Sequence, residues 1–84
     1  MPELIHQPAE QVSDLRGVAY RVLVYGVALE GGGWAGWLEF HPAGRWEAVL
    51  RTGRETSQPD RQSLAAWAEA LETGYIRAAF TRAM

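Results

Sequence analysis

The sequence predicts a small α+β domain, in which a C-terminal helical segment packs on one face of a three-stranded antiparallel β-β-β meander. Two runs rich in β-branched and aromatic residues, 18–29 and 34–41, flank three consecutive glycines, as in a hairpin. A Pro-Ala-Gly turn at 42–44 leads into a third extended run, 45–52. From about residue 60 apolar residues recur at helical spacing, so one helix layer is expected to cover the sheet.

The chain length sets the number of domains. Its 84 residues can hold one hydrophobic core. We expect a single domain over residues 18–84, preceded by an N-terminal arm over 1–17 that contains two of the four prolines and only scattered apolar residues. Val12 and Leu15 are its best anchors, and it stays open whether Pro8 starts one or two helical turns.

The turn at 42–44 predicts how the second and third strands pair. Proline presets φ for the first corner, and Gly44 can adopt the left-handed conformation that closes a three-residue loop. The residues placed opposite one another are then His41 and Arg45, Phe40 and Trp46, Leu38 and Ala48, and Gly36 and Leu50.

The first strand is apolar on both sides, so its phase stays open. The set favoured for the inward side is Tyr20, Val22 and Val24. The competing set, which then lies on the outer face beside Trp37 and Val49, is Leu23, Tyr25 and Val27.

The helical segment carries one apolar stripe, formed by Leu64, Trp67, Ala68, Leu71, Tyr75 and Ala79. Because Trp67 is the largest residue near its middle, we expect Trp67 to be the central contact with the sheet. Glycine costs about 1 kcal/mol relative to alanine in a helix interior. It therefore stays open whether the helix ends and restarts at Thr73 and Gly74.

The composition limits the class of protein. The absence of cysteine excludes disulfides and thiolate metal sites and favours the cytoplasm as the compartment. Residues 1–10 lack the basic and apolar regions of a signal peptide, and no run approaches the roughly 18 apolar residues of a membrane span. The net charge of −2 argues against the basic field that drives binding to a phosphate backbone.

The candidate catalytic and ligand motifs have structural explanations. Gly31, Gly33 and Gly36 spell G-x-G-x-x-G, but a strand rather than a helix follows, so we expect a hairpin turn and no nucleotide site. His6 and His41 have no second ligand at metal-binding spacing. The chain has no lysine or cysteine nucleophile, and its serines lack a G-x-S-x-G context. We predict no catalytic, cofactor-binding or metal-binding residue, and an enzyme of unrecognised type ranks last among three function classes.

A binding or assembly module is the favoured class. A single helix layer covers one face of a three-stranded sheet, whereas the first strand is apolar on both faces. The uncovered face would expose a larger apolar patch than monomers usually keep. We therefore expect a homodimer, or docking on a protein partner, through an interface formed by Leu23, Tyr25, Val27, Trp37 and Val49.

A nucleic-acid-binding domain is the second class. Arginine combined with aromatic residues is the pairing that single-strand binders use. The arginines near the tryptophan-bearing strands are Arg45, Arg51, Arg54 and Arg61. Three carboxylates in the same region leave it nearly neutral, so nucleic acid ranks below a protein partner.

Two motifs in the second half of the chain, E-T-x-Q-P at 55–59 and W-A-x-x-L-E at 67–72, form a recognisable signature. With the strands Y-R-V-x-V-Y-G-V at 20–27 and G-W-L-E-F at 36–40, the chain resembles a group of short, uncharacterised bacterial proteins over most of its length. This resemblance implies no activity. The β-β-β-α order is also similar to that of the N-terminal domain of HicB-type antitoxins, whose usual separate DNA-binding segment has no counterpart in this sequence.

Overall fold

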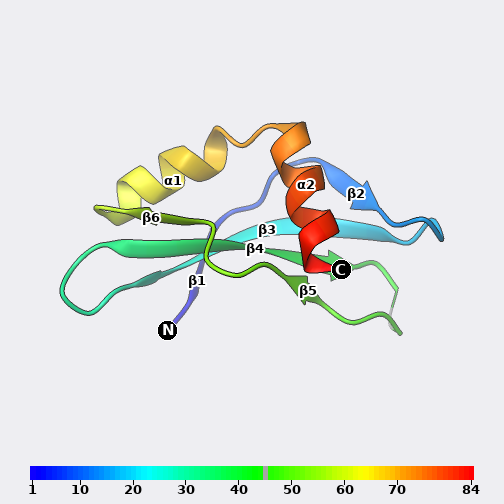
Figure 1. The fold of residues 1–84 in the computed structure, drawn as a ribbon, viewed down its shortest axis with the longest axis horizontal. Coiled ribbons are helices and arrows are strands. Elements are labelled where there is room, and N and C mark those ends of the chain that lie inside the picture. The colour runs from blue at the N-terminus through cyan, green and yellow to red at the C-terminus, as the bar shows by residue number, and fades with distance from the viewer. Residues whose placement is uncertain (45) are drawn as a thin grey trace.

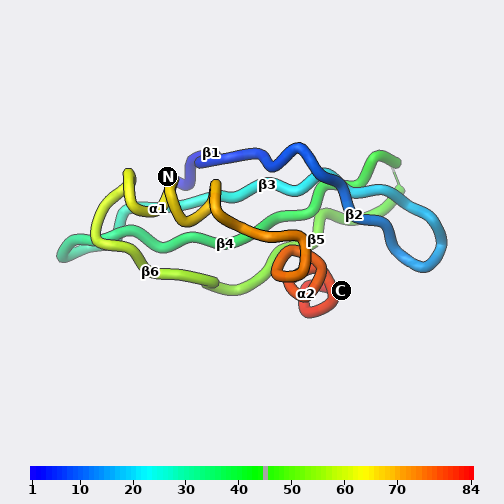
Figure 2. Tube along the Cα trace, turned by 90° about the horizontal axis from the view of Figure 1, so that it is seen from above, coloured from blue at the N-terminus to red at the C-terminus, as the bar shows by residue number. Residues whose placement is uncertain are grey.

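Residues 1–44 and 46–84 are described by a computed structural model, and they form a six-stranded antiparallel sheet with two helices over one face (Figures 1 and 2). The strands are β1 (Glu3–His6), β2 (Gln11–Ser13), β3 (Ala19–Ala28), β4 (Trp34–Pro42), β5 (Leu50–Arg51) and β6 (Thr56–Gln58). The helices are α1 (Arg61–Glu69) and α2 (Thr73–Ala83). The predicted α+β antiparallel architecture is confirmed, whereas the three-stranded meander is wrong.

The long hairpin of β3 and β4 forms the centre of the sheet. Its pairing runs from Tyr20 opposite Pro42 to Ala28 opposite Trp34. The glycines at 31–33 all have positive φ, between 85° and 107°, which other residues rarely adopt. The three-glycine stretch is therefore a turn, as predicted, and both strands end within one residue of the expected positions.

Each side of this hairpin is bordered by two short strands instead of one long one. On the β3 side, β1 and β2 pair with the two ends of β3, so residues 1–17 supply edge strands rather than a separate arm. On the β4 side, β5 and β6 pair with β4, and the chain between them bulges. At the start of this bulge the hydroxyl of Thr52 accepts a hydrogen bond from the Leu38 N–H at 3.1 Å. A side chain thus replaces the ladder carbonyl that the interrupted strand does not provide.

The connection from β4 to β5 is wider than the predicted turn. Pro42 is still part of β4, and the next amide, that of Ala43, donates to the carbonyl of Ala19 at 2.9 Å. Residues 42 and 43 thus continue the pairing with β3, and β4 next pairs with the chain at Leu50 and Arg51. Phe40 therefore lies opposite Leu50 instead of Trp46, which is a shift of four residues. Because the pairing shifts by an even number of residues, Leu50 stays on the predicted face of the sheet. Arg45, the expected partner of His41, lies outside the described residues.

Two glycines determine how closely α1 approaches the sheet. Gly26 and Gly36 are cross-strand partners, and an added Cβ would lie 2.4 Å and 2.6 Å, respectively, from the methyl groups of Leu64. Because neither glycine has a side chain, the two positions leave a hollow in the sheet surface. The side chain of Leu64 fills this hollow and is fully buried. Gly36, the last glycine of the G-x-G-x-x-G pattern, thus has a packing role.

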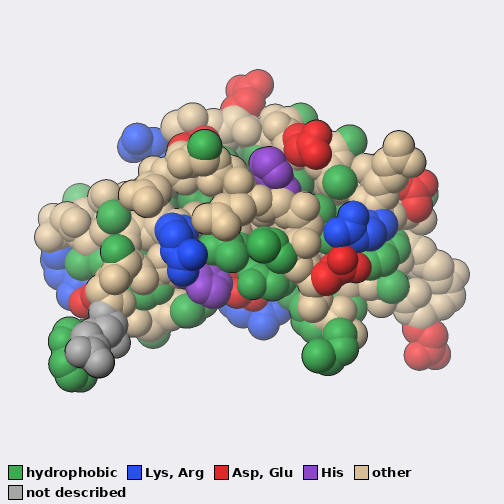
Figure 3. All heavy atoms as spheres, turned by 180° about the vertical axis from the view of Figure 1, so that it is seen from behind, with side chains coloured by type: hydrophobic (Ala, Val, Ile, Leu, Met, Phe, Trp, Pro, Cys, Tyr) green, Lys and Arg blue, Asp and Glu red, His purple; other side chains and the backbone are tan. Residues whose placement is uncertain are grey.

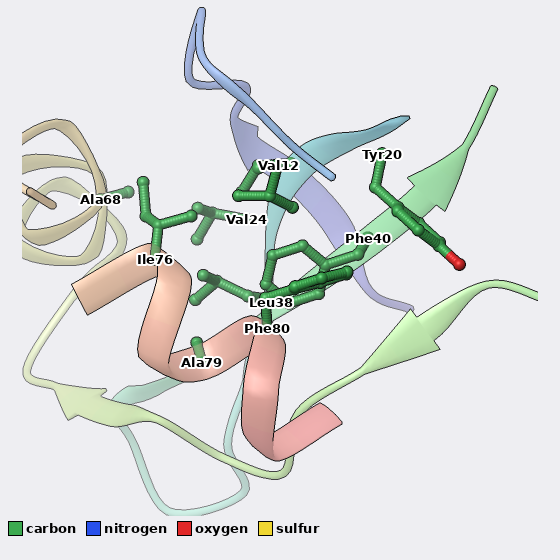
Figure 4. Packing of buried hydrophobic residues seen from close by; sticks show 10 residues of the cluster. Val12, Tyr20, Val24, Leu38, Phe40, Ala68, Ile76, Ala79 and Phe80 are labelled. Atoms are coloured by element: carbon green, nitrogen blue, oxygen red, sulfur yellow. The ribbon is translucent and has the colours of Figure 1, made fainter. Parts of the chain in front are cut away.

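The hydrophobic core lies between the sheet and the helices (Figure 4). The favoured phase of the first strand is confirmed, because Tyr20, Val22 and Val24 all point into this core. Phe80 of α2 packs against Tyr20 and Phe40, with both ring-centroid distances at 5.1 Å. The other buried members of the cluster are Val12, Leu38, Ala68, Ile76 and Ala79.

The two helices do not share one continuous stripe. Asp60 caps α1 by accepting a hydrogen bond from the Ser63 N–H at 2.7 Å, and the helix ends at Glu69 with Ala70 as its C-cap. The helical segment is thus interrupted, a few residues before the position where the sequence left a break open. Because α2 starts anew at Thr73, the buried set shifts from the predicted Tyr75 to its neighbour Ile76. Trp67 is only half-buried and packs edge-to-face on Tyr75, so its predicted central place is wrong.

Candidate interaction surface on the outer sheet face

The face of the sheet opposite the helices, here called the outer face, carries the odd-numbered residues of β3 and β4. The cross-strand pairs on it are Arg21 with His41, Leu23 with Glu39, and Tyr25 with Trp37. Both helices lie on the other side (Figures 1 and 2). In Figure 3, hydrophobic side chains gather along the lower part of the molecule, flanked by arginine and histidine side chains. The outer face is therefore an apolar surface with polar groups set among its aromatic rings.

A hydrogen-bonded triad occupies β4 on this face. The indole Nε1–H of Trp37 donates to Oε2 of Glu39 at 3.0 Å, and Nε2 of His41 is 3.0 Å from Oε1 of the same carboxylate. Burial acts to raise the pKa of Glu39, but the hydrogen bonds from Trp37 and His41 outweigh it and hold the pKa below its ordinary value. Glu39 therefore stays ionised and fixes the orientation of both rings.

The rings on the outer face also contact one another. Tyr25 stacks on Trp37 with a centroid distance of 6.4 Å and on His41 with one of 6.5 Å. The guanidinium of Arg51 in β5 lies 4.9 Å from the Trp37 ring centroid, a cation–π contact. Trp37 is thus held by a hydrogen bond, a stacked ring and a cation, and only 7% of its surface is exposed. The surface is preorganised, so binding to it would cost little side-chain ordering.

The five interface residues expected from the sequence differ in accessibility. Leu23 and Trp37 are buried beneath the neighbouring side chains, whereas Tyr25 and Val27 are half-buried. Val49, just before β5, is 50% exposed. The accessible part of the β3–β4 surface is therefore formed by Tyr25 and Val27 over a base of Leu23 and Trp37, and Val49 is exposed next to the start of β5.

The sequence reasoning missed several members of this surface. Leu4 of β1 lies opposite Tyr25 and is 44% exposed, although residues 1–17 were expected to form an arm. Glu39 was given no role, and His41 was considered only as the strand partner of Arg45 and as a metal ligand. Their spacing in Trp-x-Glu-x-His was the available signal, because alternate residues of a strand share one face and can contact one another.

The described arginines are not gathered on one surface. Arg21 and Arg51 belong to the outer face, whereas Arg61 pairs with Glu3 and Arg82 with Glu55. Within residues 1–44 and 46–84, no three histidine, cysteine or acidic side chains are grouped so that they could hold a metal ion. Neither α1 nor α2 is long and apolar enough to cross a membrane, nor is any other helix in the described part of the chain.

No protein-family model, curated protein or solved structure matches this chain. The function of the surface is therefore argued from its own geometry.

We expect the free energy of unfolding to decrease at acidic pH through Glu39. The folded-state pKa of Glu39 is lower than its unfolded value, so the carboxylate contributes stability above the unfolded value and loses it as the pH falls through the folded one. Urea unfolding curves from about pH 7 to about pH 3 would measure the loss.

Glu39→Gln is the control for this prediction. The variant should show a shallower acid dependence, with a residual slope because the pKa values of Asp14 and Asp60 are also lowered by hydrogen bonds in the folded state. Equal slopes for the variant and the unmodified protein would show that the Trp37–Glu39–His41 triad does not contribute to acid stability.

Proposed function

We propose that this protein is a small assembly module that binds a second copy of itself, or another protein, through the outer face. The observation that carries the proposal is the aromatic outer face of β3 and β4, which neither helix covers and where half-buried Tyr25 stacks on a buried Trp37 ring that is fixed by Glu39. Aromatic residues in fixed orientations are typical of interface cores, because they bury a large area at low entropic cost.

The composition of the surface supports a protein partner. Leu4, Tyr25, Val27 and Val49 supply apolar contact area at or near the sheet surface, and Arg21 lies beside them as an exposed polar residue. This arrangement of an apolar centre with a charged border is typical of protein interfaces. The other described arginines are spread over the molecule, and several of them are paired with carboxylates. This argues against a nucleic-acid backbone as the ligand, because phosphate binding needs a continuous basic surface.

The absence of cysteine supports a cytoplasmic location for this module. The resemblance to short bacterial proteins, and the order of elements similar to the N-terminal domain of HicB-type antitoxins, are compatible with a binding role and assign no activity. We propose no catalytic role.

Light scattering over a range of protein concentrations tests self-association. We expect the mass of a dimer, which should stay the same or increase at high salt, because salt screens contacts between charges but not apolar contacts. Val49→Glu and Leu4→Glu should shift the mass toward the monomer, since both side chains are exposed and their replacement leaves the core intact. Leu15→Glu, at a fully exposed apolar residue in the β2–β3 turn, is the matched control and should leave the mass unchanged.

Each other outcome has a defined meaning. A monomeric mass at all concentrations, with no effect of either substitution, would contradict self-association through the outer face. Self-association that weakens steeply with salt would indicate ionic contacts between the copies and would contradict an apolar interface.

A further inference from the structure

A cleft of about 310 Å³ lies at the junction of α1 and α2, on the side of the molecule away from the outer face. Its lining residues are Trp67, Ala70, Leu71, Glu72 and Tyr75. This junction is the orange connection at the top of Figure 1, where α1 ends and α2 begins. The cleft combines two aromatic rings with a carboxylate; Trp67 packs against the margin of the core, and Tyr75 is exposed.

The two rings meet in an edge-to-face contact beside the cleft. Their planes are 88° apart and their centroids are 6.0 Å apart. Both rings line the cleft, where a cation over a ring face and within roughly 6 Å of its centroid would make a cation–π contact. Trp67 is half-buried and Tyr75 is 38% exposed, so both rings are fixed at their base and open toward solvent.

Tyr75 is held in place by residues that do not line the cleft. Its hydroxyl donates to Glu55, which also accepts a hydrogen bond from Arg82 at 2.6 Å. The Arg82 guanidinium is 5.9 Å from the Tyr75 centroid, but Arg82 is not among the residues that line the cleft. This guanidinium is therefore tied to Glu55, and among residues 1–44 and 46–84 no cationic side chain lines the cleft.

The charge on the cleft wall is negative. Glu72 lines the cleft at the N-cap position of α2, yet its carboxylate makes no capping hydrogen bond. Among residues 1–44 and 46–84 it has no hydrogen-bond or ion-pair partner, so its charge is available to a ligand. Leu71 and Ala70 add apolar surface that suits methyl groups better than a hydrated ammonium.

We propose that this cleft binds a methylated or quaternary ammonium group, with Trp67 and Tyr75 as aromatic walls and Glu72 as the counter-charge. This chemistry favours a bulky, weakly hydrated cation, because its charge is attracted to the ring faces while its methyl groups contact Leu71. The trimethylammonium of a small choline-like molecule and that of a trimethyllysine side chain both meet these requirements.

The test uses the complete chain and two probes of the same shape. Choline carries the charge, and 3,3-dimethylbutan-1-ol is its neutral carbon isostere. In an NMR titration at constant ionic strength, the indole N–H signal of Trp67 should shift saturably with choline, which should bind about fivefold more tightly than the alcohol. A peptide with trimethyllysine, compared with the same peptide carrying lysine, distinguishes a side-chain ligand from a small molecule.

The variants separate binding from folding. Trp67→Leu and Tyr75→Leu should abolish the preference for choline, and the amide spectrum reports whether each variant is folded. Glu72 is exposed, so Glu72→Gln should weaken choline binding about two- to fivefold without changing the affinity for the alcohol. Glu69→Gln, an exposed carboxylate of α1 that does not line the cleft, is the matched control. Equal affinity for the two probes, or no saturable shift with either ammonium ligand, would overturn the proposal.

Discussion

Phe80→Ala is expected to remove a large part of the protein's stability and to lower its melting temperature by more than about 10 °C. Phe80 is 5% exposed and packs against Tyr20 and Phe40, so the substitution removes the ring that links α2 to both central strands. A buried Phe→Ala change costs about 3–5 kcal/mol, and a domain of this size is stabilised by only roughly 5–10 kcal/mol. Calorimetry and urea unfolding would measure the loss.

Phe80→Leu provides the control for this prediction. It keeps an apolar side chain between the two strands and should remain folded, with a smaller loss than the alanine variant. If Phe80→Ala had the melting temperature of the unmodified protein, α2 would not be anchored by this aromatic contact.

The second large effect is expected where Leu64 fills the hollow over Gly26 and Gly36. Leu64→Ala should cost about 2–5 kcal/mol, because it leaves a cavity at a fully buried position. Gly36→Ala should cost about 1–3 kcal/mol, because its Cβ would lie 2.6 Å from a Leu64 methyl group and 3.3 Å from Thr56.

The double variant distinguishes this packing from a general effect of glycine. Gly36→Ala combined with Leu64→Ala should cost at least about 1 kcal/mol less than the sum of the two, since the new methyl group occupies space that the leucine has vacated. Gly53→Ala is the matched control: its Cβ would contact nothing within 4 Å, and its φ is not positive. Additive costs at Gly36 and Leu64 would contradict the close contact.

The sequence predicted the elements that depend on local signals. The three glycines with positive φ specified the β3–β4 turn, the β-branched and aromatic run specified β3, and Asp60 marked the start of α1. These features depend on residues that are neighbours in the chain, so their conformational preferences are visible in the sequence.

The edge strands could not be predicted in this way. β1 has four residues and pairs with β3 about twenty residues later, with Glu3 opposite Gly26. Such a short strand has no measurable period, and its stability depends on a partner that only the folded chain supplies. The same limit applies to Val12, which is buried in the core although its surroundings in the sequence are polar.

The candidate surface was predicted in part for a related reason. Apolar content placed Leu23, Tyr25 and Trp37 on one face, but the triad depends on side-chain orientation, which hydrophobic patterning does not describe. The stripe containing Trp67 was misjudged because helical periodicity was continued across the break at Ala70, after which the second helix turns a different face to the sheet.

The interrupted borders of the sheet affect how the protein can aggregate. A long, straight outer strand offers a continuous row of free N–H and C=O groups, onto which another chain can add a strand and begin a fibril. Here each of the strands β1, β2, β5 and β6 has four residues or fewer. At the bulge between β5 and β6, the Leu38 N–H donates to the Thr52 hydroxyl instead of to a strand carbonyl. Each border therefore offers only short, discontinuous templates, and growth by strand addition is disfavoured even at high protein concentration.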